Sequence, residues 1–439
     1  MRVDLRLAVV LPILGVFTAT AAPAQAAGAE AVTYYEHVLP ILQENCQTCH
    51  RPTGQNTTGI IAPMSLMTYE ETRPWARAVA QKVTAHEMPP WYATAPTGVF
   101  SNERGLTDAE IDTIVSWVDA GAPAGDKAGA PGTRLFGDEE SGWFLGTPDF
   151  VITMDDYLVP DDTYDLQTTF RTKIDDALLP DGGVWVRGWE FRAGTNGDRV
   201  HHFCAGVEDA DTVVTADQLE DDEGAAADQG GSLGCVSAGT EGKLLPEGWG
   251  MFIETGSTVR YNMHYNKEPG PGTAFNNQAE IGFFLSKEPA KYVFQNSAIG
   301  NRGFMIPAHR AGYRVGAGRV LEKDTYVVNW WPHAHFRGVA ARYTATYPDG
   351  REELLLDVPD WEQGWQETYW YKEPKLLPKG TVIDFSMWYD NTSERGMRRG
   401  FNADRSLGHA ARTNDEMALG FLGYAEAVEP ASAAAANEQ

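Results

Sequence analysis

The spacing of apolar residues divides the chain into a helical part and a β-rich part. Up to about residue 126, apolar residues recur at helical intervals, and the last expected helix starts with a capping box of Thr107 and Glu110. From Pro148 onward, short runs of β-branched and aromatic residues alternate with Gly, Pro and Asp turns. This pattern predicts a multidomain protein, a small all-α domain followed by two all-β jelly-roll-like sandwich domains. The expected helices cover 34–45, 68–85 and 107–121.

The start of the chain is typical of a secretory signal peptide. Arg2 and Arg6 precede the apolar run 7–17, and Ala24-Gln25-Ala26 is a small-residue cleavage site. We therefore expect a periplasmic or secreted protein, with no membrane span because no later segment is long and apolar enough. The expected segments are 1–26 signal peptide, 27–126 helical domain, 127–147 linker, 148–286 first β domain, 287–425 second β domain and 426–439 disordered tail.

The charge of the chain excludes one class of partner. It has 35 basic and 61 acidic residues, a net charge of −26, so binding to a nucleic-acid backbone is not its main role. Acidic residues are dense in 208–228, which we expect to be a solvated loop. Cys204 and Cys235 flank this loop, and in an exported protein we expect them to form a disulfide.

A haem attachment motif lies in the helical part. In Cys46-Gln47-Thr48-Cys49-His50 the two cysteines would form thioethers with a c-type haem, and His50 would be an axial ligand of the iron. A redox-active dithiol beside an unrelated histidine is the alternative. Met88, just before two prolines, is the expected sixth ligand, and a methionine there raises the reduction potential. The alternatives for the sixth ligand are His86, Met64 and Met67. This block resembles a class I cytochrome c.

Histidines in the β-rich part predict metal binding. His333 and His335 are two apart in strand-like sequence, so both can face one metal ion. His201 and His202 are adjacent, and both can bind one ion only where a strand ends or bulges. Five imidazoles and one thioether, with no cysteine among them, favour copper over zinc or iron. The candidate ligands are His201, His202, His264, His333, His335 and Met417.

The order of these ligands resembles that of the copper type II ascorbate-dependent monooxygenases, which include peptidylglycine α-hydroxylating monooxygenase and dopamine β-monooxygenase. The resemblance spans about 148–425 and rests on His-His, Met-His-Tyr, His-Ala-His and Asp-Glu-Met in that order. Further matches are Met305-Ile306-Pro307, Trp365-Gln366 and the segment 387–392.

The resemblance implies two jelly-roll-like domains that each hold one copper ion, on opposite sides of a solvent-filled cleft. It assigns electron storage to the copper of His201, His202 and His264. It assigns O₂ binding and catalysis to the copper of His333, His335 and Met417. The implied reaction hydroxylates a C–H bond of a small organic substrate.

The chain departs from that family in its substrate pocket and its electron source. Trp331 and Phe421 replace the arginine and tyrosine that hold a peptide carboxylate, so an apolar or aromatic substrate is expected. Asn262 replaces a glutamine near the first copper. The fused haem is expected to replace ascorbate, or to relay electrons from a periplasmic donor. Two other interpretations stay open, a non-hydroxylating electron-transfer or copper-handling protein and a substrate oxidase that passes electrons out through the haem.

Overall fold

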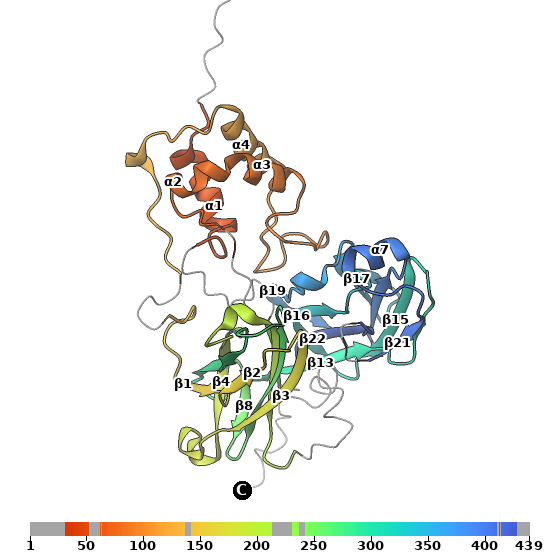
Figure 1. The fold of residues 1–439 in the computed structure, drawn as a ribbon. Coiled ribbons are helices and arrows are strands. Elements are labelled where there is room, and N and C mark those ends of the chain that lie inside the picture. Colours follow the sequence, from red (N-terminus) through yellow and green to blue (C-terminus); the bar gives the residue numbers. More distant parts are fainter. Residues whose placement is uncertain are drawn as a thin grey trace, which may run out of the picture.

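A computed structural model describes most of the chain. The expected signal peptide, most of the acidic loop and the end of the chain from residue 428 lie outside the described residues. Figure 1 shows a helical part that lies against two β-rich units placed side by side. No helix within the described residues is long and apolar enough to cross a membrane. The described residues are 31–51, 62, 64–136, 142–212, 231–236, 242–410, 412 and 414–427.

The helical part contains the expected helices, with one correction. The helix predicted over 68–85 is interrupted in its first half, because Pro74 has no N–H to donate and its ring disfavours a regular α-helical turn. The capping box is present as predicted, since Thr107 caps the N–H of Glu110 and the Glu110 carboxylate accepts from Thr107 N at 2.8 Å. The elements are η1 (Tyr34–Val38), α1 (Leu39–Asn45), α2 (Tyr69–Thr72), η2 (Arg73–Trp75), α3 (Ala76–Thr84), α4 (Asp108–Asp119) and η3 (Lys127–Gly129).

The helices enclose a small apolar core of their own. Tyr34, Leu42, Ile114 and Trp117 are each fully buried in it. Trp117 donates from Nε1 to the carbonyl of Pro123 at 2.9 Å, which holds the end of α4 against the chain that follows it. The helical part is therefore a separately cored unit.

The predicted linker over 127–147 is packed at both of its described ends. Near its start, Gln43 on α1 donates to the carbonyl of Gly132 at 2.7 Å. Near its end, the backbone N–H groups of Phe144 and Leu145 donate to the buried carboxylate of Glu190 at 2.7 and 2.9 Å. Both contacts reduce the freedom of the helical part relative to the β-rich part.

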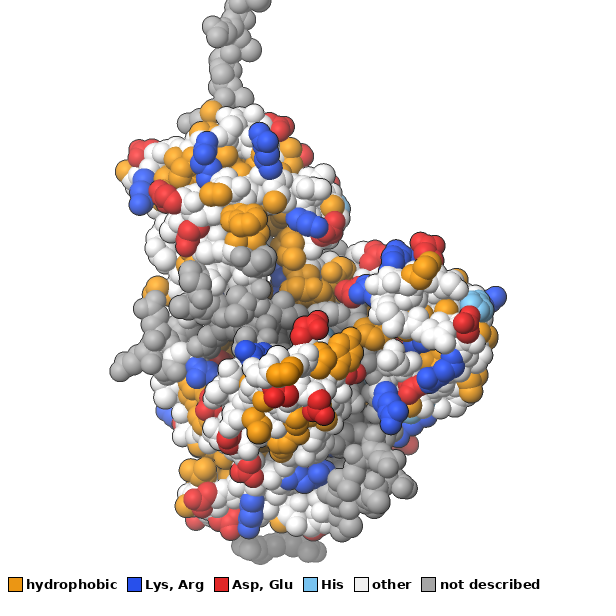
Figure 2. All heavy atoms as spheres, viewed as in Figure 1, with side chains coloured by type: hydrophobic (Ala, Val, Ile, Leu, Met, Phe, Trp, Pro, Cys, Tyr) orange, Lys and Arg blue, Asp and Glu red, His pale blue; other side chains and the backbone are white. Residues whose placement is uncertain are grey.

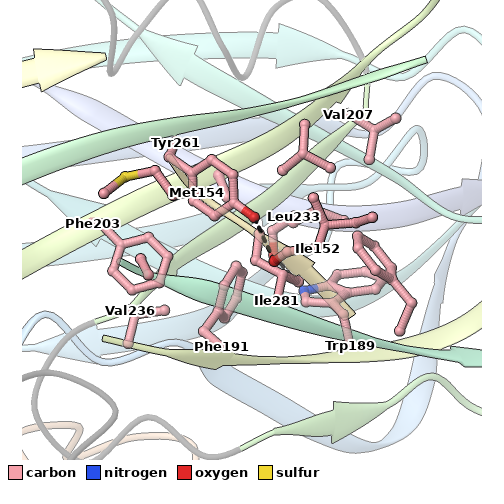
Figure 3. Close-up of a cluster of buried hydrophobic side chains, with 14 of the residues drawn as sticks. Ile152, Met154, Trp189, Phe191, Phe203, Val207, Leu233, Val236, Tyr261 and Ile281 are labelled. Carbon is pink, nitrogen blue, oxygen red and sulfur yellow. Dashed lines mark hydrogen bonds between the residues drawn. The ribbon is translucent and has the colours of Figure 1, made fainter. Parts of the chain in front are cut away.

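The first β unit contains two main sheets around one core. Their strand orders are β1-β11-β4-β8-β12, with β7 beside β4, and β3-β9-β5-β6. In the core, Tyr261 donates to the carbonyl of Ile152 at 2.7 Å and Trp189 donates to that of Leu233 at 2.8 Å (Figure 3). The strands are β1 (Phe150–Thr153), β2 (Tyr157–Val159), β3 (Asp165–Lys173), β4 (Gly183–Arg192), β5 (Val200–Glu208), β6 (Ser232–Val236), β7 (Lys243–Leu244), β8 (Trp249–Glu254), β9 (Thr258–Asn266), β10 (Phe275–Asn277), β11 (Glu280–Leu285) and β12 (Tyr292–Val293).

The second β unit also has two four-stranded sheets around one core. Their orders are β13-β22-β16-β19 and β15-β20-β17-β18, and all of their pairings are antiparallel. The elements are β13 (Gln295–Gly300), β14 (Met305–Ile306), β15 (Tyr313–Val320), β16 (Thr325–His333), β17 (Gly338–Thr346), β18 (Glu352–Val358), η7 (Gln363–Trp365), β19 (Tyr369–Leu377), β20 (Val382–Tyr389), α7 (Ser393–Arg399), β21 (Leu407–Gly408) and β22 (Leu419–Glu426).

These sheets confirm a largely β-sheet C-terminal region, while its jelly-roll character stays a prediction. The chain leaves the first unit a little after the expected boundary at 287, because β12 pairs with β8 and β13 pairs with β22. Each β unit therefore has its own pair of sheets, and the candidate ligands are distributed between them.

Candidate haem cavity and metal centres

The haem motif opens onto a cavity of about 340 Å³. Cys46, Cys49 and His50 line it from one side, and Met88 with its two following prolines lines it as well. Among the described residues, the cavity wall includes Met88 but none of the alternative ligands His86, Met64 and Met67. Arg134 on the wall can pair with a haem carboxylate, whereas the guanidinium of Arg104 is already bound to Glu367. The residues present therefore fit a c-type haem.

His50 is prepared to act as a metal ligand. Its Nδ1 donates to the carbonyl of Met64 at 3.1 Å, which leaves Nε2 for the iron. Burial lowers the pKa of His50 below its ordinary value of 6.5, so the imidazole is neutral at pH 7. Met64 thus contacts the haem ligand through its backbone carbonyl.

Cys46 does not have the character of a redox-active thiol. Burial raises the pKa of Cys46 from 9.0 to about 12. A redox-active cysteine needs the opposite shift, because the thiolate is its reactive form. The buried thiol beside a neutral histidine fits thioether attachment instead.

Three histidines of the first β unit meet at one point. The ligand nitrogens of His201, His202 and His264 all lie within 4.8 Å of one another. The pairing of β5 with β9 has a bulge between Val200 and His202, which is the irregularity that adjacent histidines need to face one ion. His264 comes from the neighbouring strand, directly opposite His202. The three side chains therefore make a compact all-imidazole site.

Asp165 on β3 orients the third histidine. Its carboxylate accepts a hydrogen bond from Nε2 of His264, and that bond is the main reason why the pKa of Asp165 is lowered. Nδ1 of His264 is buried and has no hydrogen-bond partner, so it is the nitrogen available to a metal. A carboxylate that holds the far nitrogen of a ligating histidine is the usual support of such a ligand. Sequence analysis did not identify Asp165, because it lies 99 residues from His264 and belongs to no local motif.

His333 and His335 lie at the end of β16, with one correction to the prediction. The strand ends at His333, so the two residues do not share a regular strand. Instead, the backbone N–H of His335 donates to the buried carboxylate of Glu416 at 2.8 Å. The two rings are 5.3 Å apart between centroids and nearly perpendicular. The pair is therefore held by a buried acid rather than by strand geometry.

Both of these histidines have their Nδ1 atoms engaged. Nδ1 of His333 lies 2.6 Å from Oε1 of Gln366, and Nδ1 of His335 lies 3.2 Å from the carbonyl oxygen of Asp415. Both acceptors fix the tautomer with Nε2 directed away from them, toward a metal. Both partners lie in motifs noted in the sequence, Gln366 in Trp365-Gln366 and Asp415 in Asp-Glu-Met, but neither was assigned this role.

Met417 follows two residues that hold His335. The Glu416 carboxylate accepts from the backbone N–H of His335 at 2.8 Å, and the carbonyl oxygen of Asp415 lies 3.2 Å from its Nδ1. Met417 is completely buried, and its carbonyl accepts a hydrogen bond from Tyr389 at 2.5 Å. Burial also raises the pKa of the neighbouring Glu416 to about 7. A soft thioether beside two imidazoles is a donor set suited to copper.

The two β units contact each other through apolar side chains. Cys204 and Cys235 form the predicted disulfide, and Cys204 packs in one buried cluster with Trp331, Met417 and Phe421. Here the two β units are in apolar contact, whereas the family resemblance implies a solvent-filled cleft. The rings of Trp331 and Phe421 are 4.4 Å apart and border a cavity of about 40 Å³. This wall is aromatic because Trp331 and Phe421 themselves form part of it, and the class of substrate stays a prediction.

Comparisons with known proteins bear on the two parts differently. No curated protein matches the chain. The solved structures that resemble it include the capsids of broad bean stain virus (8% identity, 64% of this chain and 89% of that chain, TM-score 0.30) and cowpea mosaic virus (6%, 65% and 92%, TM-score 0.32). The major capsid protein P2 of bacteriophage PM2 is another (10%, 64% and 99%, TM-score 0.26). Scores this low carry no argument about the β units. Residues 40–121 match the cytochrome c family, and this part of the chain is therefore a cytochrome c domain, which implies haem c and haem-mediated electron transfer.

Proposed function

We propose that the protein is a copper-dependent monooxygenase that hydroxylates a C–H bond of a small apolar or aromatic substrate with O₂. Its electrons would arrive through the c-type haem of its own cytochrome c domain. The observation that supports this most strongly is the pair of imidazole groups on neighbouring β units. One is a compact three-histidine site, and the other has two histidines, one of which is bound by Asp415 and Glu416 directly before the buried Met417.

The different donor sets suit different roles. Three imidazoles with a carboxylate behind them suit a copper ion that changes oxidation state without binding substrate. A thioether is a soft ligand that favours Cu(I), the oxidation state that binds O₂, so the site with Met417 suits the copper ion where O₂ and substrate react. When bound, copper would supply one-electron chemistry and O₂ binding at His333, His335 and Met417.

The residues around the second site supply orientation and a dry environment. Gln366 and Asp415 fix the rotation of the two imidazoles, and Glu416 holds the backbone at His335. Met417 is completely buried, and Trp331 and Phe421 beside it are less than a tenth exposed. Apolar walls of this kind favour an apolar substrate and exclude water from the reacting atoms.

The first test is hydroxylation by the copper-loaded protein in periplasm-like, oxidising buffer. We would supply a one-electron donor, ¹⁸O₂ and a panel of small alkylbenzenes, with a glycine-extended peptide as the expected non-substrate. The proposal predicts an ¹⁸O-labelled alcohol from an alkylbenzene. Met417→Ala should lower its rate by more than about tenfold, because a ligand is removed. Met397→Ala is the matched control, since Met397 is 82% exposed.

Two other outcomes would replace the proposal. Copper in both sites with no labelled product from any substrate would indicate an electron-transfer or copper-handling protein. Reduction of the haem by substrate in the absence of O₂ would indicate an oxidase that passes electrons outward.

A further inference from the structure

The cytochrome c domain is docked on the second β unit and not merely tethered to it. Between Met88 and α4 the chain runs along the edge of β19, where Ser101 N donates to Trp370 O at 2.7 Å and Lys372 N donates to Val99 O at 2.8 Å. Phe100 between them is 1% exposed and stacks on Tyr371 at 5.1 Å. It belongs to the apolar core of the second β unit. In Figure 2, hydrophobic side chains continue across this junction.

The docked segment also forms part of the haem cavity. Residues 101–104 line the cavity, next to Met88 and its prolines. Their far side is bound to the second β unit, because Asn102 donates to Glu367 at 2.9 Å and to Thr368 O at 2.7 Å. Arg104 forms a largely buried ion pair with Glu367. Residues 101–104 therefore both line the haem cavity and bind the surface of the second β unit.

Trp365 closes the same wall from the side of the β units. Among the described residues that line the cavity, it is the one that belongs to a β unit. Its neighbour Gln366 is buried and holds Nδ1 of His333 at 2.6 Å. The carbonyl of Gln366 also accepts from Trp331 Nε1 at 3.0 Å, which fixes the backbone between the cavity and the histidine. Three consecutive residues thus line the haem cavity, hold a ligand histidine and anchor the cytochrome c domain.

The three-histidine site has no comparable connection within the described residues. None of its strands, β3, β5 and β9, contributes a residue to the cavity wall. The first β unit contacts the docked segment where Lys243 Nζ donates to Ser101 at 2.8 Å. Lys243 lies on β7, which pairs with β4 and not with a strand that carries a ligand histidine. Within the described residues, the route that runs from the cavity wall through Trp365 and Gln366 therefore ends at His333.

We propose that Trp365 and Gln366 form the electron route, so that electrons enter the copper centres at His333 and reach the three-histidine site afterwards. Each transfer takes one electron from a ferrous haem, which becomes ferric, and reduces one Cu(II) to Cu(I), with no bond made and no proton moved. This inference rests on the proposed function, since it needs copper at both sites. The proposed order is the reverse of the one in which the electron-storing copper of the three-histidine site is reduced first.

The test follows the haem absorption bands in the absence of O₂. Full-length protein with both coppers oxidised would receive less than one equivalent of a fast electron donor to the haem, and reoxidation of the haem would be timed. Copper EPR would report which site loses its signal. In the wild type we expect haem reoxidation together with loss of the His333-site signal.

Four variants decide between the entry points. His264→Ala, which removes the three-histidine site, should leave the first electron transfer intact. His333→Ala should leave the haem reduced although the three-histidine site still holds copper. Trp365→Leu should slow the transfer by tenfold or more at an unchanged haem reduction potential, and Trp365→Phe should restore part of the rate. Trp75→Leu is the matched control, because Trp75 is 45% exposed and does not line the cavity.

The contrary results are equally definite. Transfer that survives in His333→Ala and is lost in His264→Ala would overturn the inference, as would an unchanged rate in Trp365→Leu. Failure of the proposed function is detected separately, by asking whether a reductant that bypasses the haem supports ¹⁸O₂ incorporation. That assay can succeed when the route through Trp365 is wrong, and it can fail when the route is right.

Discussion

Phe100→Ala tests whether a buried contact holds the cytochrome c domain in place. The Phe100 ring is 1% exposed, stacks on Tyr371 at 5.1 Å and lies 5.7 Å from the ring of Tyr369. Removing a buried phenylalanine side chain costs about 3–5 kcal/mol, of which aromatic pairing contributes about 0.5–1.5 kcal/mol. The backbone hydrogen bonds on either side of Phe100 do not depend on its side chain.

The loss should appear mainly as undocking. A cost of about 3 kcal/mol raises the ratio of undocked to docked molecules by a factor on the order of 10². We expect the segment 91–104 to become a site of limited proteolysis, and the transfer from haem to copper to slow, while the haem spectrum is unchanged. Phe252→Ala is the control, since Phe252 is 43% exposed on the first β unit. Equal protease resistance and equal transfer rates in the two variants would refute the docking argument.

Three further predictions concern single contacts. Asp165→Asn should weaken copper binding at the three-histidine site by about 10–100-fold in a chelator competition, because Asp165 orients His264, and unchanged affinity would contradict that role. Met88→Leu should lower the haem reduction potential in a redox titration, because it removes the methionine ligand. An unchanged potential would indicate that His86, Met64 or Met67 is the sixth ligand instead. Cys204→Ser should lower the free energy of unfolding by about 2–4 kcal/mol in urea, since the disulfide closes a loop of 31 residues; an effect no larger under oxidising than under reducing conditions would exclude the crosslink as the cause.

The features that the sequence predicted correctly are local ones. The haem motif and the capping box at Thr107 each lie within a few residues, so their spacing alone carries the information. The break at Pro74 could also have been predicted from the local sequence, because proline disfavours a regular α-helical turn. The prediction of one continuous helix did not take this into account. The bulge at His201 was stated as a geometric requirement, and the pairing of β5 with β9 contains it.

The features that were missed depend on contacts between distant segments. Glu416 reaches the backbone of His335 across 81 residues, and Asn102 reaches Thr368 across 266. No residue in 91–104 marks it as a segment that packs on β19, since its aromatic residues equally suit a haem-packing loop. Tyr369 and Tyr371 contact Trp91 and Phe100 only because the folding of β19 brings these residues together. Residues that position ligands are therefore harder to predict than the ligands themselves.

The docked arrangement changes what the fused haem does. A flexible tether only raises the effective concentration of one partner near another, and each electron then needs a new encounter. Here Trp365 lines the haem cavity and its neighbour Gln366 holds His333. The next residue, Glu367, forms an ion pair with Arg104 of the cytochrome c domain. Because the side chains of this ion pair are only 16% and 10% exposed, salt screens it much less than it screens a surface encounter. A fixed route of this kind makes the rate of electron delivery a property of residues 365–367, so lengthening the linker after Phe136, beyond its contacts with the cytochrome c domain, should leave that rate unchanged.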